Sequence, residues 1–155
     1  MIGGRKIAIV SATQIERATK YTKEATETEP GVLKTLNPAA FLEVIRKADA
    51  TSDYVIVEVH WGTEGSLHEE KSQRLLAELY AEAGADAVIG GHPHRLQGCG
   101  FTDGVPVAYS LGNFWFSTGT LYTTLAKITI TEDGAVTLSY VPCIQKGYKH
   151  SDRAG

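Results

Sequence analysis

The spacing of apolar and polar positions divides the first part of the chain into three strands and two helices. Segments 6–10, 53–60 and 85–90 are rich in apolar and β-branched residues, which is typical of strands buried on both faces. Apolar residues recur at helical spacing over 38–48 and 66–83. Strands that alternate with helices in this way predict an α/β fold.

Local signals predict where both helices begin and end. Asn37 is a preferred N-cap, and Pro38 suits the first helical position. Ser66 and Glu69 have the spacing of a capping box, and Gly84 suits a left-handed helix end. The second helix is expected to pair Glu70 with Arg74 and to bury Leu75, Leu76, Leu79 and Ala83.

Beyond Gly98 the pattern changes to short strands separated by turns. Strands are expected at 98–102, 105–110, 121–131 and 135–145. Gly104 and Gly134 supply the positive φ that hairpin turns need. The sequence therefore predicts a mixed α/β (α+β) sheet followed by an antiparallel meander, in one domain over 1–148 with a polar tail at 149–155.

Composition and charge exclude several classes of protein. The chain has 155 residues, of which 43% are hydrophobic, and this suits a single domain with a buried core. The net charge is -3 and the basic residues are scattered, which argues against binding to nucleic acid. The sequence lacks the features of a signal peptide or membrane anchor, so we expect no membrane contact from this chain.

The two cysteines, Cys99 and Cys143, are far apart and lack a C-x-x-C spacing. A disulfide between them remains open. Two buried thiols are the favoured interpretation.

Three of the five histidines follow predicted strands. His60 ends the strand at 53–60, and His92 and His94 follow the strand at 85–90. Neutral imidazole is a common ligand of zinc and similar metals, and catalytic groups gather at the carboxyl ends of strands in α/β sheets. We therefore expect the three side chains to converge on one metal site.

The residues around the second histidine pair support this interpretation. Pro93 is expected to hold His92 in an extended conformation, so that His92 and His94 point the same way. Gly90 and Gly91 would leave room for an approaching ion or substrate. The alternative is a loop that is merely rich in turn-forming residues.

Two further polar residues are candidates for the site. Glu64 follows His60 by four residues, where it would orient a ligand, act as a base or simply be solvated. Asn113 ends a strand and would face a substrate or hold a turn. The aromatic residues at 114–116 favour a core or interface role over a cofactor platform, and His68 is expected on the surface.

Three sequence blocks occur in the order typical of one family. They are IVEVHWGTE at 56–64, GADAVIGGHPH at 84–94 and YSLGNF at 109–114. The chain resembles the bacterial poly-γ-glutamate capsule biosynthesis (CapA-type) proteins, which belong to the calcineurin-like metallophosphoesterase superfamily. The resemblance covers roughly residues 54–116.

This resemblance implies part of a four-layer αββα sandwich with two divalent metal ions (Mn, Fe or Zn) at strand ends. It assigns His60 and His92 to one ion and His94 to the other. On the hypothesis of a metal-dependent hydrolase, Asn113 or Glu64 would border the substrate. The implied reaction is metal-dependent phosphoester hydrolysis. The implied ligand is an anionic or phosphorylated small molecule or an envelope polymer.

The family motifs that supply carboxylate ligands have no match in this sequence. The chain therefore resembles the C-terminal portion of a longer, surface-located parent protein, and we expect weak or absent metal binding and no activity from this chain alone. Exposed sheet surface is expected to drive homo-oligomerisation. The alternative function is a non-catalytic binding or export component of envelope polymer synthesis.

Overall fold

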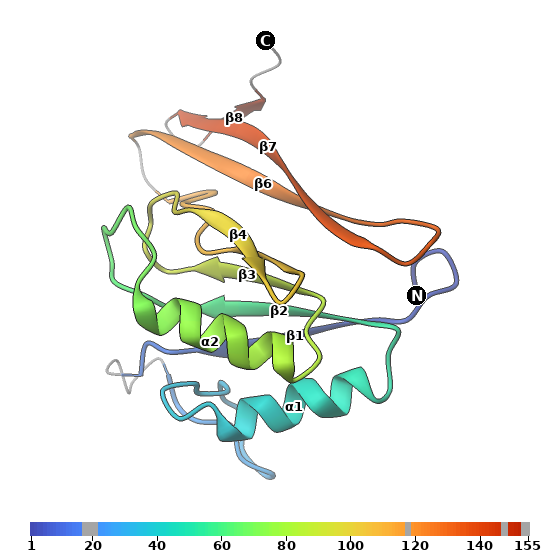
Figure 1. The fold of residues 1–155 in the computed structure, drawn as a ribbon. Coiled ribbons are helices and arrows are strands. Elements are labelled where there is room, and N and C mark those ends of the chain that lie inside the picture. The colour runs from blue at the N-terminus through green and yellow to red at the C-terminus, as the bar shows by residue number, and fades with distance from the viewer. Residues whose placement is uncertain (17–21, 117–118, 147–148, 153–155) are drawn as a thin grey trace.

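The computed structural model describes residues 1–16, 22–116, 119–146 and 149–152, which form two helices and two sheets (Figure 1). The predicted α/β class is confirmed. Strand β8 lies within the segment that the sequence assigned to a polar tail. In chain order the elements are β1 (Ile7–Thr13), α1 (Ala39–Asp49), β2 (Tyr54–His60), α2 (Lys71–Glu82), β3 (Ala87–Gly91), β4 (Cys99–Thr102), β5 (Val105–Ala108), β6 (Thr120–Ile130), β7 (Val136–Lys146) and β8 (Lys149–Asp152).

The first sheet is mixed and has the strand order β1-β2-β3-β5-β4. Strands β1, β2, β3 and β5 run parallel, and β4 pairs antiparallel with β5. The register places Thr13 opposite His60 and His60 opposite Gly91. The carboxyl ends of β1, β2 and β3 therefore meet at one edge, where the loops that follow β2 and β3 begin.

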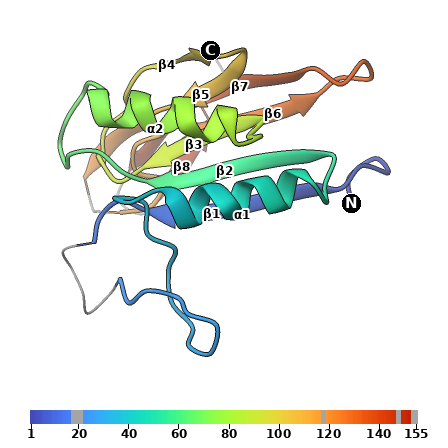
Figure 2. The ribbon, with the colours of Figure 1, turned by 60° about the horizontal axis from the view of Figure 1, so that its bottom comes forward.

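The core lies between this sheet and the two helices, which cover the same face (Figure 2). Side chains along β2 point alternately to its two faces. Those of Val55, Val57 and Val59 face the helices and are at most 1% exposed. Trp61 continues this face, fully buried, and stacks with Tyr80 at a ring-centroid distance of 6.2 Å. Helix α1 contributes Phe41 and Ile45, and α2 contributes Leu76, Ala77 and Tyr80.

The second sheet, of order β6-β7-β8, covers the opposite face of the first (Figure 1). The predicted single meander is therefore wrong, because the β4–β5 hairpin joins the first sheet through parallel pairing of β5 with β3. Arg5 ties the two sheets together at one end by donating hydrogen bonds to the Tyr54 hydroxyl (2.8 Å) and the Thr131 carbonyl (3.0 Å). The described residues thus form three layers, namely helices, mixed sheet and antiparallel sheet.

Helix α1 agrees with its predicted range to within one residue at each end, whereas α2 begins later than predicted. Its capping box is formed by Glu70 and Gln73, and the Ser66 hydroxyl bonds locally to the His68 backbone instead. No helix among the described residues is long and apolar enough to cross a membrane.

Two side-chain predictions for α2 are wrong. Leu75 faces solvent with 47% exposure, and fully buried Gln73 lies on the inner face. Arg74 pairs with Glu69, at 3.2 Å, rather than with Glu70. Gly84 has the left-handed φ of 106° that was expected after the helix.

The cysteines are both free thiols. Cys143 is buried, as the sequence suggested, whereas Cys99 is exposed, so that prediction is wrong for one of the two. Cys99 lies on β4, which is an edge strand of the first sheet among the described residues.

Gly90 provides a test of how closely the core is packed. A Cβ atom at position 90 would lie 2.1 Å from the Tyr109 carbonyl oxygen and 2.3 Å from Trp61 Nε1. We expect Gly90→Ala to lower the free energy of unfolding by about 3 kcal/mol, because neither neighbour can move without disturbing the core. Urea denaturation would measure the loss. The control is Gly100→Ala on β4, where a Cβ atom meets nothing within 4 Å and the effect should be about 0.5 kcal/mol or less.

The edge of β1 ahead of Thr13 leads to a second prediction; Thr13 itself bonds to Leu33 and Thr35. Ile9 on this strand is 70% exposed, and unpaired strand edges with apolar side chains promote association. We expect the chain to self-associate at micromolar concentration and Ile9→Lys to shift it toward monomer in light scattering. Leu67→Lys, in the loop before α2 and also exposed, should have no such effect. A monodisperse wild-type monomer would contradict the expectation.

Candidate functional site

The predicted site residues lie at the carboxyl ends of β2 and β3. His60 is the last residue of β2, and His92 and His94 follow β3 directly. Parallel pairing of His60 with Gly91 brings the first two rings together, with His60 Nε2 3.0 Å from His92 Nδ1. This is a hydrogen-bond distance, so the N–H of one imidazole donates to the ring nitrogen of the other.

The backbone of the second histidine segment differs from the expected extended form. His92 has a φ of 99° and His94 a φ of 57°, and residues other than glycine rarely adopt such positive values. The extended His92 predicted from Pro93 is therefore wrong, and the two rings do not point the same way. His92 turns toward His60, whereas His94 lies with its ring centroid 6.0 Å from that of His92. Positive φ at His92 and His94, on either side of Pro93, is the kind of backbone strain that clusters at functional sites.

His94 belongs to a different set of contacts. Its Nδ1 lies 2.5 Å from Asn113 Oδ1, and because an amide oxygen only accepts, the His94 proton is on Nδ1. The Nε2 lone pair is thereby left free, as a metal ligand requires. The ring of Phe116 lies 4.5 Å away, centroid to centroid, and limits how far His94 can turn. Asn113 therefore orients the His94 ring. This role differs from both that the sequence left open, which were facing a substrate and holding a turn.

The glycines before His92 have different roles. The space beside Gly90 is occupied by core atoms, because the Trp61 indole donates a hydrogen bond to the Tyr109 carbonyl (2.9 Å) there. The expectation that Gly90 leaves space for a ligand is therefore wrong. Gly91 fits that expectation better, because a Cβ atom there would lie 4.0 Å from His60 Nδ1. Trp61 faces the core, opposite to His60, and is not a neighbour of the imidazole.

The electrostatics of the pair favour neutral imidazole. Partial burial lowers the pKa of His60, and the nearby His92 and His94 lower it further. Burial and His94 also lower the pKa of His92, against a smaller opposing effect of the Glu64 carboxylate. Neutral rings offer lone pairs to a metal, which protonated rings do not.

Two of the three histidines fit a shared metal ion. Two nitrogens bound to one zinc ion at roughly 2.05 Å lie about 3.3 Å apart in tetrahedral geometry. His60 Nε2 and His92 Nδ1, at 3.0 Å, need to separate by only a few tenths of an ångström. Among the described residues, however, no group of three or more His, Cys, Asp or Glu side chains is arranged to hold an ion. The described residues thus bring two imidazole nitrogens close to the spacing of a shared ion.

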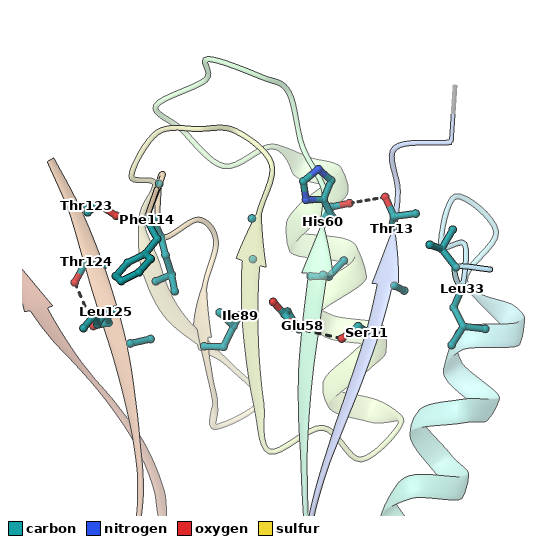
Figure 3. Close-up of a pocket in the computed structure, with 18 of the residues that line it drawn as sticks. Ser11, Thr13, Leu33, Glu58, His60, Ile89, Phe114, Thr123, Thr124 and Leu125 are labelled. Atoms are coloured by element: carbon teal, nitrogen blue, oxygen red, sulfur yellow. Dashed lines mark hydrogen bonds between the residues drawn. The ribbon is translucent and has the colours of Figure 1, made fainter. Parts of the chain in front are cut away.

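A cleft of 740 Å³ opens beside His60 between the two sheets (Figure 3). Strands β1, β2 and β3 line one side and β6 the other, with Leu33 and Phe114 at the rim. Glu58 contributes a carboxylate that accepts a hydrogen bond from Ser11 at 3.3 Å. The described lining residues include no lysine or arginine. Phe114 and its two aromatic neighbours are more than half exposed, so they are not core residues.

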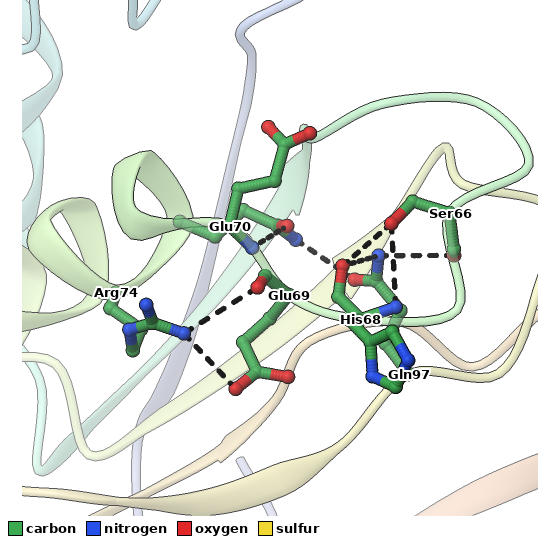
Figure 4. A network of polar contacts seen from close by, with 7 residues as sticks. Ser66, His68, Glu69, Glu70, Arg74 and Gln97 are labelled. Atoms are coloured by element: carbon green, nitrogen blue, oxygen red, sulfur yellow. Dashed lines mark hydrogen bonds and ion pairs between the residues drawn. The ribbon is translucent and has the colours of Figure 1, made fainter.

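Two glutamines that the sequence analysis did not single out connect the histidine-bearing loops (Figure 4). Gln97 Nε2 donates to the carbonyls of Ser66 (3.2 Å) and His68 (3.0 Å), and Gln97 Oε1 accepts from Gln73. The spacing of Glu70 and Gln73, which is that of a capping box, was the available signal. No sequence pattern could have identified Gln97, because its hydrogen-bond partners are distant in sequence. Glu64 and His68 are exposed on the same loop.

Comparison with known proteins identifies similar chains. A family model described as bacterial capsule synthesis protein PGA_cap matches residues 1–118. The PGA biosynthesis protein CapA of Bacillus subtilis (strain 168) is 36% identical over 118 residues, covering 76% of this chain and 30% of that protein. The capsule biosynthesis protein CapA of Bacillus anthracis is 37% identical over 131 residues, covering 79% and 32%.

The chain thus spans about a third of the length of these two relatives. All three sequence blocks, at 56–64, 84–94 and 109–114, lie inside the matched range. The resemblance to CapA-type proteins is confirmed. The chain belongs to the bacterial capsule synthesis protein (PGA_cap) family.

Proposed function

We propose that this chain carries the histidine half of a divalent-metal hydrolase site in a protein of capsule or poly-γ-glutamate synthesis. The close approach of His60 Nε2 and His92 Nδ1 is the observation that supports this proposal most directly. These atoms come from the end of β2 and from the loop that follows β3, they share one hydrogen bond, and a metal ion would take the place of its proton. The metallophosphoesterase-like fold and the phosphoester reaction are part of the proposal.

Each residue has a defined task at such a site. His60 and His92 hold one ion, and His94 presents Nε2 to a second because Asn113 fixes its proton on Nδ1. Glu64, near His92, lies where it would accept a proton or border the substrate. When bound, a divalent ion (Mn, Fe or Zn) supplies an activated water and polarises a phosphoryl oxygen.

The cleft beside His60 suits the position of a substrate. We infer that the substrate is an anionic or phosphorylated small molecule or a segment of an envelope polymer, consistent with the capsule and PGA terms in the relatives' names. Because no lysine or arginine is among the described lining residues, an anion would depend on the metal for its opposite charge. A capsule polymer lies outside the cell, so we place the parent protein at the cell surface.

One observation favours a second candidate function. Among the described residues no carboxylate completes the histidine pair, and neutral imidazoles alone do not balance a dication. A non-catalytic component that binds or exports the polymer would need no more than the fold and the cleft.

Metal binding tests the first proposal. We expect the chain to bind one Zn²⁺ or Ni²⁺ weakly in calorimetry, because two imidazole nitrogens are already close to ligand spacing. His60→Ala and His92→Ala should each weaken binding by roughly tenfold or more. His68→Ala, an exposed imidazole on the adjacent loop, is the matched control and should change nothing. Equal heats for the wild type and a triple alanine variant at 60, 92 and 94 would rule the site out.

Activity tests whether the site is complete within this chain. We expect this chain alone to hydrolyse neither a generic phosphomonoester nor a phosphodiester, with or without added Mn²⁺, because the histidine pair lacks a carboxylate partner. The measurement is release of a chromogenic leaving group over hours. Robust turnover that His92→Ala abolishes would contradict this expectation and establish a complete site within the chain.

A further inference from the structure

The two loops that bear the histidines have few direct connections. Beyond the last pair of the β2–β3 ladder, the backbone bonds between them are Trp61 N to Gly91 O (3.0 Å) and Gly65 N to Pro93 O (2.8 Å) among the described residues. The loop after β2 then runs on to α2, and the loop after β3 runs on to β4.

The Gln97 carboxamide spans the gap between the loops (Figure 4). Its Nε2 uses both hydrogens on carbonyls of the first loop, those of Ser66 and His68, at 3.2 and 3.0 Å. The Gln97 backbone is itself fixed, because its N–H donates to the Ser110 carbonyl at 3.1 Å, next to the end of β5. Gln97 follows His94 by three residues and belongs to the same loop.

The Gln73 carboxamide anchors Gln97 to the core. Gln73 is fully buried on the first turn of α2, and its Nε2 donates to Gln97 Oε1 at 3.0 Å. Its Oε1 accepts from the Glu70 amide at 2.9 Å, which fixes the orientation of the carboxamide. Gly62 packs against the same group, since a Cβ atom there would lie 2.9 Å from Gln73 Cδ. A buried amide with one partner on each side has no alternative orientation that leaves both satisfied.

We propose that Gln73 and Gln97 are positioning residues that hold the two loops together beyond the strand ends and so maintain the close approach of His60 and His92 that the strand pairing brings about; this inference rests on the proposed metal site. The two carboxamides form a relay from α2 to both loops. The relay holds the strained His92 backbone against His60 in the absence of any ion. Loss of the relay frees the loops to separate while the sheet and the helix remain.

Variants at Gln97 test the relay, because this side chain is only half-buried and its replacement leaves the core intact. Gln97→Met keeps the volume and removes the donors. Gln97→Glu keeps the shape and directs an acceptor at two carbonyls. The matched control is Tyr80→Phe, which deletes a buried hydrogen bond to Thr35 (2.6 Å) in which neither loop takes part. Urea denaturation checks that every variant is folded.

The first readout needs no metal. In the wild type the ¹⁵N NMR shifts of the His60 and His92 rings should report the shared hydrogen bond, and in both Gln97 variants they should move toward those of free imidazole. The second readout is Zn²⁺ calorimetry, in which we expect an affinity at least about tenfold weaker in both variants. Tyr80→Phe should leave both readouts at wild-type values.

The outcomes separate the relay from the metal site. Unchanged ring shifts in folded Gln97→Met and Gln97→Glu would overturn the positioning role, whatever the zinc affinity. Changed ring shifts together with wild-type zinc affinity would also overturn it, because the maintained approach would not matter for the ion. If the wild-type chain binds no zinc, the proposed metal function fails, and the ring shifts alone decide whether the relay positions the histidines.

Discussion

The alternation of side chains along β2 is the constraint on which the rest of the structure depends. Val55, Val57, Val59 and Trp61 face the helices, so the residues between them, including Glu58 and His60, necessarily face the second sheet. A slip of one residue would place a carboxylate and an imidazole in the core. Trp61 prevents that slip, because its indole fits only beside Gly90 and bonds only to the Tyr109 carbonyl. The packing of one aromatic residue thus decides where the candidate ligand points.

The sequence predicted the elements whose signals are local and strong. The buried strands β1, β2 and β3 and the helix α1 were found because continuous apolar runs and helical spacing are properties of short windows. The start of α2 was missed because two segments, at 66–69 and 70–73, have capping-box spacing and only packing decides between them. The pairing of β5 with β3 was missed because a parallel partner is distant in the chain.

The candidate site shows the same division between local and long-range information. The approach of His60 to His92 follows from two strand ends in one parallel sheet and was predictable. The divergence of His94 toward Asn113 was not, because it depends on positive φ values that a rule for residues preceding proline does not anticipate. The bridge from Gln73 through Gln97 joins three separate segments, which no local pattern encodes.

The position of the histidine pair has a consequence for the chain entropy of the fold. His60 and His92 are 32 residues apart, and the intervening loop contains the whole of α2, the crossover that parallel pairing of β2 and β3 requires. An ion held by both rings closes this loop as a cross-link does, and the chain-entropy relation for cross-links assigns a loop of that length about 4 kcal/mol. An occupied site would therefore tie the crossover helix to the sheet, and the two side chains would stabilise the topology as well as hold the ion.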